Sequence, residues 1–430
     1  MLRFAPSPTG DMHIGNLRVA ILNYLVAKQR GERFLIRIED TDTQRNIEGK
    51  DQEILEILQK FGLKYDDVVY QSQNFSFHQN FAKKLLREHK AFPCFCTSQE
   101  LEAERQKAKE HKRAYRYSGK CENITLEEAT QKKEPFVVRI KKPHNPIEFY
   151  DLIKGDLRFE PKEVDSFVIV RADGRPTYNF ACAIDDMLYD ISLVIRGEDH
   201  VSNTPKQIHI QRALGYDKKI EYAHLPIILN SEGKKMSKRE SASSVKWLLE
   251  EGFLPEAIAN YLILLGNKTP KEIFTLQEAI EWFDLSALSK APARFDMEKL
   301  RFINRVHLER LPPQKLAQEI GIHESLGELA KLYLEEASTL KELKSKLDAI
   351  FGQKEFGEFE EEANILKNLI LSMELSESFE SFKKELMAKS GLKGKRFFKP
   401  LRLLLTGAPH GPEISQLYAV LKDHIKGIVQ

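Results

Sequence analysis

The sequence predicts a mixed α/β fold in its first half and helical domains after it. Over roughly the first 240 residues, short apolar runs of strand length alternate with runs of helical spacing. After that point the apolar residues follow helical spacing towards the end of the chain. A chain of 430 residues can form about two to four domains, each with a substantial core.

The chain opens with a predicted strand, turn and helix. Residues 2–4 are a short apolar segment that suits a buried strand, and two prolines and a glycine then force an irregular turn. From Leu17 onward the apolar residues have helical spacing, and Gly31 is the predicted stop. The turn residues His13 and Gly15 therefore lie at the amino end of the helix.

That helix end is suited to phosphate, because it carries free backbone N–H groups and partial positive charge. Gly15 lets a nucleotide approach the backbone closely, and His13 can donate a hydrogen bond to a phosphoryl oxygen. A proline-containing loop before an ordinary amphipathic helix gives the same pattern, so this segment alone does not fix a function.

A second segment, Lys-Met-Ser-Lys-Arg at 235–239, places three cations on a short loop. It follows an apolar run at 224–230, which suits one buried strand, and a turn at 231–233. Nucleotidyl transfer concentrates negative charge in the transition state, and Lys and Arg stabilise such charge. Taken alone, the segment is better explained as a solvated basic loop.

Taken together, the two segments resemble the signature motifs of class I aminoacyl-tRNA synthetases, specifically the bacterial-type glutamyl-tRNA synthetases. Residues 13–16 resemble the "HIGH" box with Asn16 in the last place, and residues 235–239 resemble the "KMSKS" box with Arg239 in the last place. The resemblance is strong to about residue 300 and looser beyond it. Three further stretches look like the glutamate subgroup: residues 37–42, 176–180 and 196–200.

The resemblance implies a Rossmann-type class I catalytic domain that is interrupted by an inserted domain for the tRNA acceptor end. Helical stem-contact and anticodon-binding domains should follow it. The expected boundaries are 1–82 and 180–240 for the catalytic domain, 83–179 for the insert, 241–302 for the stem-contact domain and 303–430 for the anticodon-binding domain.

Local patterns agree with this order. Within and just after the insert, strand-like runs occupy 136–140, 166–170 and 177–184, with a hairpin turn at 172–174. Cys182 is expected to be a core residue of the last of these strands. Helices are predicted at 245–251 and 254–265, and Gly252 and Pro255 mark the boundary between them.

The implied activity is the ATP-dependent attachment of L-glutamate to the 3′ end of tRNA-Glu, tRNA-Gln or both, by way of glutamyl-adenylate. The catalytic residues implied are His13, Lys235 and Lys238, with Mg²⁺ assisting. The resemblance assigns ATP binding to Thr9, Gly10, His13, Gly15, Asn16, Glu198 and Lys238, and glutamate binding to Arg3, Ala5, Ser7, Glu39, Tyr178 and Arg196.

The residue types suit the substrate, because glutamate presents two carboxylates and one ammonium. An arginine fork can bond both oxygens of a carboxylate, and Glu39 can pair with the ammonium. The alternative is that Arg37 and Arg196 form surface ion pairs with Glu39 and Glu198, which would contribute little.

Three of the four cysteines cluster in sequence, and so few cysteines do not make a disulfide scaffold. A Cys-x-Cys pair with a later Cys is a candidate zinc site. Similar synthetases and their short relatives use Cys-x-Cys followed by Tyr-x₃-Cys, which implies a tyrosine as the fourth ligand, whereas His111 is merely near in sequence. The predicted ligands are Cys94, Cys96, Tyr117 and Cys121; three metal-free thiols are the alternative.

Composition restricts the remaining possibilities. The net charge is only +2, so a nucleic-acid surface must be a local patch, and residues 383–402 are rich in Lys and Arg. Phe397 and Phe398 within that patch are expected in the core, although they could instead stack on unpaired bases. With no long apolar stretch and no apolar leader, a cytoplasmic protein is expected, and we expect a monomer.

Other functions share parts of these patterns. A glutamyl-queuosine-type modifying enzyme would share the catalytic half and the tyrosine-containing zinc site, but normally lacks the C-terminal helical domain. A glutaminyl enzyme would carry β-barrel anticodon domains. A catalytically inactive RNA-binding paralogue would not be expected to keep His13, Lys235, Lys238 and Glu39.

Overall fold

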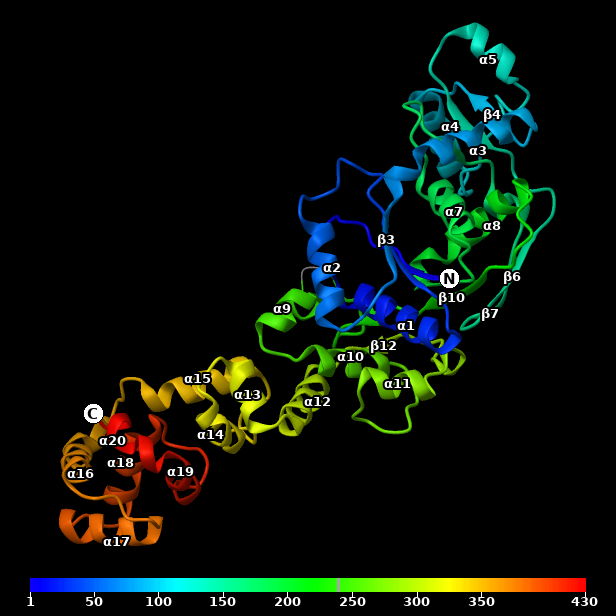
Figure 1. Cartoon of the computed structure of the whole chain (residues 1–430). Coiled ribbons are helices and arrows are strands. Elements are labelled where there is room, and N and C mark those ends of the chain that lie inside the picture. Colours follow the sequence, from blue (N-terminus) through cyan, green and yellow to red (C-terminus); the bar gives the residue numbers. More distant parts are fainter. Residues whose placement is uncertain (238–239) are drawn as a thin grey trace. The chain divides into compact units, whose positions relative to one another are not determined.

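The computed structural model describes residues 1–237 and 240–430, which form two compact units (Figure 1). Unit 1 comprises residues 1–245 and 262–295, and unit 2 comprises residues 246–261 and 296–430. A search of the described residues finds no helix with the length and apolar character needed to cross a bilayer.

Unit 1 is built on a seven-stranded sheet in which neighbouring strands run parallel, except at one edge. This confirms the predicted mixed α/β fold. The sheet order is β3 (Asp67–Tyr70), β2 (Phe34–Ile38), β1 (Leu2–Phe4), β9 (Leu193–Gly197), β10 (Glu221–Leu225), β6 (Ile147–Asp151) and β7 (Gly155–Phe159).

The direction of strand addition reverses at β1, because β2 and β3 extend the sheet on one side while β9 and β10 extend it on the other. In open α/β sheets such a switch point opens a crevice at the carboxyl ends of the strands, where ligands bind. The predicted first helix is α1 (Ile14–Arg30), which packs against β1 and β9. Gly31 ends it in the left-handed conformation (φ 63°), as predicted.

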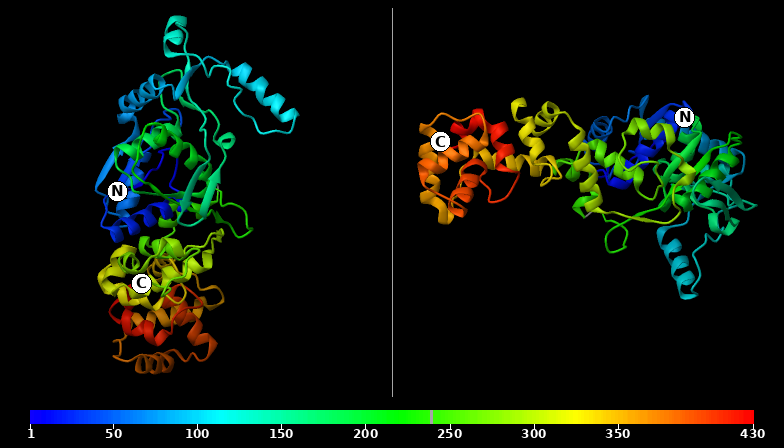
Figure 2. Two further views of the ribbon diagram at one scale, coloured as in Figure 1. Left: turned by 90° about the vertical axis from the view of Figure 1, so that its right-hand side faces the viewer. Right: turned by 90° about the horizontal axis from the view of Figure 1, so that it is seen from below.

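The segment predicted as an insert is divided between two sheets. A three-stranded sheet has the order β4 (Ala91–Cys94), β5 (Val137–Ile140) and β8 (Val168–Val170). The strands β6 and β7, however, form a hairpin that pairs with β10 and extends the main sheet. Helix α4 (Ser98–Glu110) buries none of its residues and projects from the small sheet (Figure 2).

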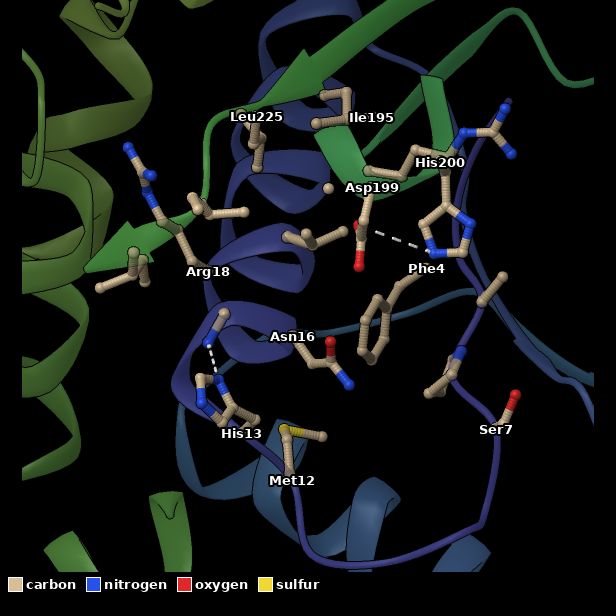
Figure 3. A pocket seen from close by; sticks show the side chains of 18 of the residues that line it. Phe4, Ser7, Met12, His13, Asn16, Arg18, Ile195, Asp199, His200 and Leu225 are labelled. Carbon is tan, nitrogen blue, oxygen red and sulfur yellow. Dashed lines mark hydrogen bonds and ion pairs between the residues drawn. The ribbon is translucent and has the colours of Figure 1, made fainter. Parts of the chain in front are cut away.

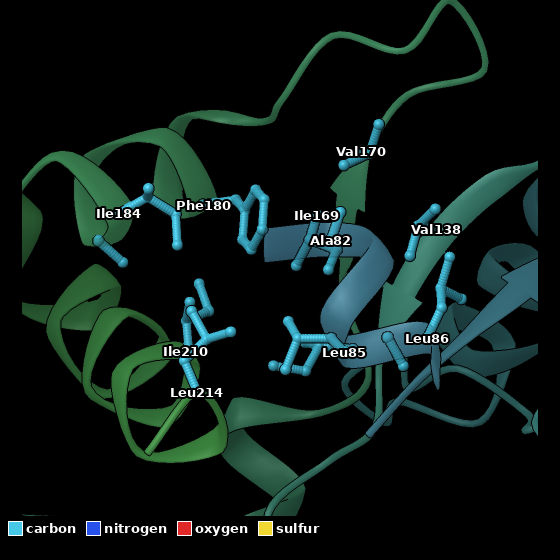
Figure 4. Close-up of a cluster of buried hydrophobic side chains, with 13 residues drawn as sticks. Ala82, Leu85, Leu86, Val138, Ile169, Val170, Phe180, Ile184, Ile210 and Leu214 are labelled. Carbon is cyan, nitrogen blue, oxygen red and sulfur yellow. The ribbon is translucent and has the colours of Figure 1, made fainter. Parts of the chain in front are cut away.

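The run 177–184 was predicted as a strand, and this prediction is wrong: residues Tyr178–Leu188 form helix α7. Every residue from 180 to 186 is buried, so no alternation between buried and exposed positions distinguishes strand from helix in the sequence. The helix packs between α3 (Phe75–Arg87) and α8 (Thr204–Ala213). Figure 4 shows Phe180 and Ile184 of α7 facing Leu85 and Ile210 in this core.

The apolar run 224–230 was predicted as one strand, but it forms parts of two. β10 ends at Leu225, and Pro226, which has no N–H to donate, precedes the short strand β11 (Ile228–Leu229). β11 pairs with β12 (Ala293–Arg294). The predicted turn at 231–233 is confirmed, with Gly233 at φ 77°.

Unit 2 is helical in its described residues. The two helices predicted near residue 250 are present as α9 (Val245–Glu250) and α10 (Pro255–Leu264), and Gly252 between them has φ 85°. A Cβ at Gly252 would lie 2.6 Å from the backbone nitrogen of Lys341, so only glycine fits there.

The remaining α-helices complete the two units. In unit 1 these are α2 (Lys50–Lys60), α5 (Leu126–Lys132), α6 (Pro161–Val164) and α11 (Leu276–Trp282). In unit 2 they are α12 (Met297–Arg310), α13 (Pro313–Ile320), α14 (Gly327–Leu332), α15 (Leu340–Phe351), α16 (Glu360–Ser372), α17 (Phe379–Ser390), α18 (Lys395–Thr406), α19 (Ile414–Leu421) and α20 (Ile425–Ile428).

The Lys-rich segment 383–402 lies on α17 and α18. Phe397 is fully buried, as predicted, but Phe398 is 41% exposed, so the prediction that both are core residues is wrong for Phe398. Successive helical residues point in directions about 100° apart, following from roughly 3.6 residues per turn, so only one of the two neighbours can face the core. Phe398 shares a surface hollow with Lys399 and Arg402.

Candidate active site and metal cluster

A cavity of about 390 Å³ lies at the carboxyl ends of the parallel strands of unit 1. Its walls come mainly from the ends of β1, β9 and β10 and the segments after them, from the starts of α1 and α7, and from Glu39 just after β2. This is the crevice expected at the switch point of the sheet. The predicted site residues that line it are Arg3, Ala5, Ser7, Thr9, Gly10, His13, Gly15, Asn16, Glu39, Tyr178, Arg196 and Lys235.

His13 is the N-cap of α1, and its Nδ1 accepts a hydrogen bond of 3.0 Å from the backbone N–H of Gly15. In the neutral ring the proton is therefore on Nε2. Figure 3 shows the side chains of His13, Asn16, Asp199 and His200 around the same space. This wall combines a helix amino terminus with a histidine N–H, and both favour an anionic ligand.

The basic segment meets the same cavity. Lys235 and Met236 line it, and the Lys235 ammonium lies 3.6 Å from the carboxylate of Asp199. The backbone N–H of Val245, just beyond the segment, donates to the carbonyl of Met12 at 3.0 Å. The structure thus brings together Lys235 and His13, although Lys238, the other predicted catalytic lysine, lies outside the described residues together with Arg239.

Arg3 belongs to a buried network of charges. Its Nε and Nη2 donate to Asp186 at 3.1 and 3.4 Å, and the same carboxylate accepts from Arg37 at 2.5 Å. Arg37 also donates to Oε1 of Glu39 at 3.2 Å, and the thiol of Cys182 contacts that oxygen at 3.0 Å. Burial opposes ionisation of Asp186, but the two guanidinium groups outweigh it and lower the pKa of this carboxyl.

Arg196 is also buried, but its partners are neutral. Nε donates to Nε2 of His224 at 3.2 Å, and Nη2 donates to the hydroxyl of Thr204 at 2.6 Å. Nη1 is buried and has no hydrogen-bond partner among the described residues. The surface ion pairs considered as an alternative are therefore wrong: Arg37 pairs with Glu39 in the interior, and Arg196 does not pair with Glu198.

Glu198 was predicted to bind ATP, but it is not part of the cavity lining. One carboxylate oxygen accepts from the backbone N–H of Ile227 at 2.9 Å, and the other pairs with Lys154. Through these contacts Glu198 links the end of β9 to the segment after β10.

The sequence analysis missed several lining residues, including Asp199, His200 and Leu225. Nδ1 of His200 lies 3.2 Å from the hydroxyl of Tyr178, and their rings are 5.7 Å apart. Burial, followed by the charge of Arg196, lowers the pKa of His200. Asp199 and His200 fall within the motif 196–200, so their position directly after a buried strand was the available signal.

The predicted metal ligands form a second cluster, beside the small sheet. The sulfur atoms of Cys94, Cys96 and Cys121 all lie within 4.8 Å of one another. The hydroxyl of Tyr117 is 3.5 Å from the sulfurs of both Cys94 and Cys96. His111 is exposed and bonds to a backbone carbonyl of its own helix, so it does not join the cluster.

The cluster offers three thiols, which are common ligands of structural zinc, and a phenol oxygen as a fourth donor. Burial, together with the neighbouring thiols, raises the pKa of Cys96 to about 12. For Cys94, burial is outweighed by hydrogen bonds from Tyr117 and Arg139, which lower its pKa. A dication would favour the deprotonated form of all four groups, so the residues present fit a zinc ion.

Comparisons with known proteins agree with this geometry. The family model described as "tRNA synthetases class I (E and Q), catalytic domain" matches residues 1–302, and the model "Anticodon binding domain" matches residues 302–424. The chain therefore belongs to the class I tRNA synthetases of the glutamate and glutamine group.

Full-length relatives identify the subgroup within this family. The chain is 75% identical to glutamate–tRNA ligase 1 of Nitratiruptor sp. over 100% of both chains, and 59% identical to glutamate–tRNA ligase 1 of Campylobacter jejuni over 99% of both. A crystal structure of the glutamate tRNA ligase from Elizabethkingia meningosepticum in complex with its amino acid has a TM-score of 0.85 at 29% identity, covering 99% of this chain and 97% of that one. Within the group, the chain belongs to the bacterial glutamate–tRNA ligase family.

Proposed function

We propose that the chain joins L-glutamate to the 3′ end of a tRNA in an ATP-dependent reaction that passes through glutamyl-adenylate. The supporting observation is that one cavity combines a helix amino terminus, a basic segment and the buried arginines Arg3 and Arg196. The helix terminus and the basic segment suit a triphosphate, and the arginines suit the two carboxylates of glutamate.

In the first step, an oxygen of the glutamate α-carboxylate attacks the α-phosphorus of ATP in line, and the bond to pyrophosphate breaks. His13 and the lysines at 235 and 238 are proposed to stabilise the negative charge that develops on the phosphates. Mg²⁺ is expected to accompany the triphosphate. No covalent enzyme intermediate is needed, since catalysis is positioning and charge stabilisation.

In the second step, a hydroxyl of the terminal tRNA ribose attacks the mixed anhydride, and AMP leaves. Arg3 and Arg196 are proposed to bind the carboxylates of glutamate, Glu39 its ammonium, and Ser7 and Tyr178 to supply neutral hydrogen bonds. Family resemblance further implies that tRNA must be present before the amino acid is activated, which we include in the proposal.

Charging of purified tRNA by the full chain, with radioactive glutamate, tests this function. We expect Lys238→Ala to lower pyrophosphate exchange roughly a hundredfold or more, because it removes a cation from the transition state, and to leave tRNA binding largely intact. Lys234→Ala is the matched control, since Lys234 is 76% exposed and paired with Glu232. Equal activity of Lys238→Ala and the wild type would contradict the role of the basic segment.

The choice of tRNA is part of the same experiment. Side-by-side charging of tRNA-Glu and tRNA-Gln would show whether one or both are substrates.

We further propose a monomer in the cytoplasm, which gel filtration and cell fractionation would check. If all of the tRNA-charging activity eluted at the size of an oligomer, the proposal of a monomer would be contradicted.

We infer that Cys94, Cys96, Tyr117 and Cys121 hold a structural zinc ion outside the reaction itself. Elemental analysis of the purified chain should then find about one zinc per chain, and Cys96→Ser should lose it. Tyr117→Phe removes only the phenolic oxygen and should weaken zinc retention under a chelator. Full zinc content in Cys96→Ser would contradict the site.

A further inference from the structure

Two acceptors within the protein bind the Nε and Nη2 groups of the Arg196 guanidinium and fix its orientation. Arg196 is 6% exposed, and its Nε and Nη2 are occupied by His224 and Thr204. Only Nη1 lacks a partner among the described residues, and Arg196 lines the cavity. A buried donor without a partner is costly unless a ligand completes it, so the side chain is held ready for an acceptor that arrives with the substrate.

His224 can hold Arg196 only in one protonation state. Its Nε2 accepts the N–H of Arg196 at 3.2 Å, so this nitrogen must carry its lone pair; the hydroxyl of Thr204 lies 2.9 Å from the same nitrogen. The proton of the neutral ring must therefore be on Nδ1. A proton on Nε2 would point at a cation and turn an attraction into a repulsion.

Asp151 fixes that state from the other side of the ring. Its Oδ2 accepts the Nδ1–H of His224 at 2.6 Å. Its Oδ1 accepts backbone N–H groups of Ile153 at 2.9 Å, Lys154 at 2.8 Å and His224 at 3.3 Å. Both Asp151 and His224 have 0% exposure, so water does not compete for these bonds.

We propose that Asp151 and His224 are positioning residues for glutamate binding, acting through Arg196. Asp151 selects the imidazole tautomer and His224 accepts from Nε, so the guanidinium of Arg196 is held at the cavity wall for a substrate carboxylate. This inference rests on the proposed function, in which Arg196 binds glutamate. Neither residue lines the cavity, and neither touches the substrate.

Asp151→Asn tests the tautomer directly. The three backbone N–H groups hold the amide oxygen in the place of Oδ1, so the amide NH₂ replaces Oδ2 and donates to Nδ1. The imidazole proton is then forced onto Nε2, facing Arg196. We expect the KM for glutamate to rise roughly tenfold or more, as for a lost charge-assisted hydrogen bond, with the KM for ATP changed less than about twofold.

A second buried Asp–His pair provides the control. Asp185 accepts from His78 at 2.8 Å, both have 0% exposure, and neither lines the cavity. Asp185→Asn should lower the melting temperature without changing the KM for glutamate. If Asp151→Asn does the same, its role is structural only and the proposal is overturned.

A pair of His224 variants covers the case in which Asp151→Asn does not fold. His224→Phe removes the acceptor, whereas His224→Gln can return an amide oxygen near the position of Nε2. The KM for glutamate should rise more in His224→Phe than in His224→Gln; equal KM values in both variants and the wild type would overturn the proposal. Failure of the wild type itself to charge tRNA with glutamate would instead refute the proposed function.

Discussion

Arg3 and Arg196, which both line the cavity, are supported in opposite ways. Arg3 forms an ion pair with Asp186, which also holds Arg37, so its charge is balanced within the protein. Arg196 is held by an imidazole and a hydroxyl, and no ion pair involves it among the described residues. Both side chains are more than nine-tenths buried, so the difference does not come from solvent.

This contrast separates stability from ligand binding. A buried charge that is paired within the protein needs no ligand, and removing its partner is strongly destabilising. A buried cation without a counter-ion gains most when a substrate anion arrives. We therefore expect the network of Arg3 to serve mainly the fold and Arg196 to serve mainly the binding of glutamate.

The largest effect should follow from Asp186→Ala, which leaves Arg3 without its counter-ion and Arg37 with only Glu39. The free energy of unfolding of the enclosing unit should fall by about 3–5 kcal/mol, measured by urea denaturation. Asp199→Ala is the control, because this carboxylate is 56% exposed and its pair with Lys235 contributes little. Equal losses in the two variants would remove the contrast between a buried and an exposed pair.

The next effect separates the arginines themselves. Arg196→Gln should raise the KM for glutamate on the order of a hundredfold, since it removes a charged donor that has no internal counter-ion. Arg3→Gln should raise it less and lower the stability more. The measurement is steady-state charging across a glutamate titration, together with a thermal melt of each variant. The reverse order of KM values would show that internal pairing does not decide which arginine binds the substrate.

A smaller effect is expected for Thr204→Val, which keeps the shape of a fully buried side chain and removes one acceptor of Arg196. The loss of one hydrogen bond between a charged donor and a hydroxyl, about 1.5 kcal/mol, corresponds to a KM increase of roughly tenfold. Thr204→Ser is the matched control, because it keeps the hydroxyl and should retain the wild-type KM. No difference between the Val and Ser variants would exclude the hydroxyl from the support of Arg196.

The smallest effect concerns pH. Burial lowers the pKa of His224 in the folded chain, so below about pH 6.5 the unfolded chain takes up a proton that the folded chain does not. Stability should thus decline on acidification from that point, by less than about 1.4 kcal/mol per pH unit for this group. His224→Gln should remove this part of the slope in urea titrations at several pH values; an unchanged slope would contradict it.

The carboxylate of Asp186 should respond in a different pH range. Its pKa is lowered in the fold, so its contribution is complete above the unfolded value of about 3.9 and is lost only as the pH falls further. Mild acidification therefore lowers the stability through His224 before it does so through Asp186.

Much of the cavity could be predicted from the sequence because its parts lie in short segments with strong local signals. Gly15 after His13, at the start of a helical pattern, predicts the end of α1 that we propose to bind phosphate. The position of Glu39 directly after an apolar strand likewise places it at the carboxyl edge of the sheet.

The support behind the cavity could not be predicted, since it is formed by residues far apart in the chain. Asp151 and His224 are separated by 73 positions, and neither stands in a recognisable motif. The helix α7 was missed for a related reason: burial on all sides erased the periodicity of 180–186. Only tertiary packing determines these features.

The hairpin of β6 and β7 has a consequence for any attempt to shorten this chain. Asp151 ends β6 and pairs in register with Tyr222 of β10, so the excursion at 83–179 returns a strand to the main sheet. Deleting that excursion to obtain a minimal adenylating core would expose the backbone of β10 and leave His224 with no carboxylate beside it. The boundary that permits trimming therefore lies before Ile147, and a shortened enzyme must retain the hairpin as the support behind its amino-acid pocket.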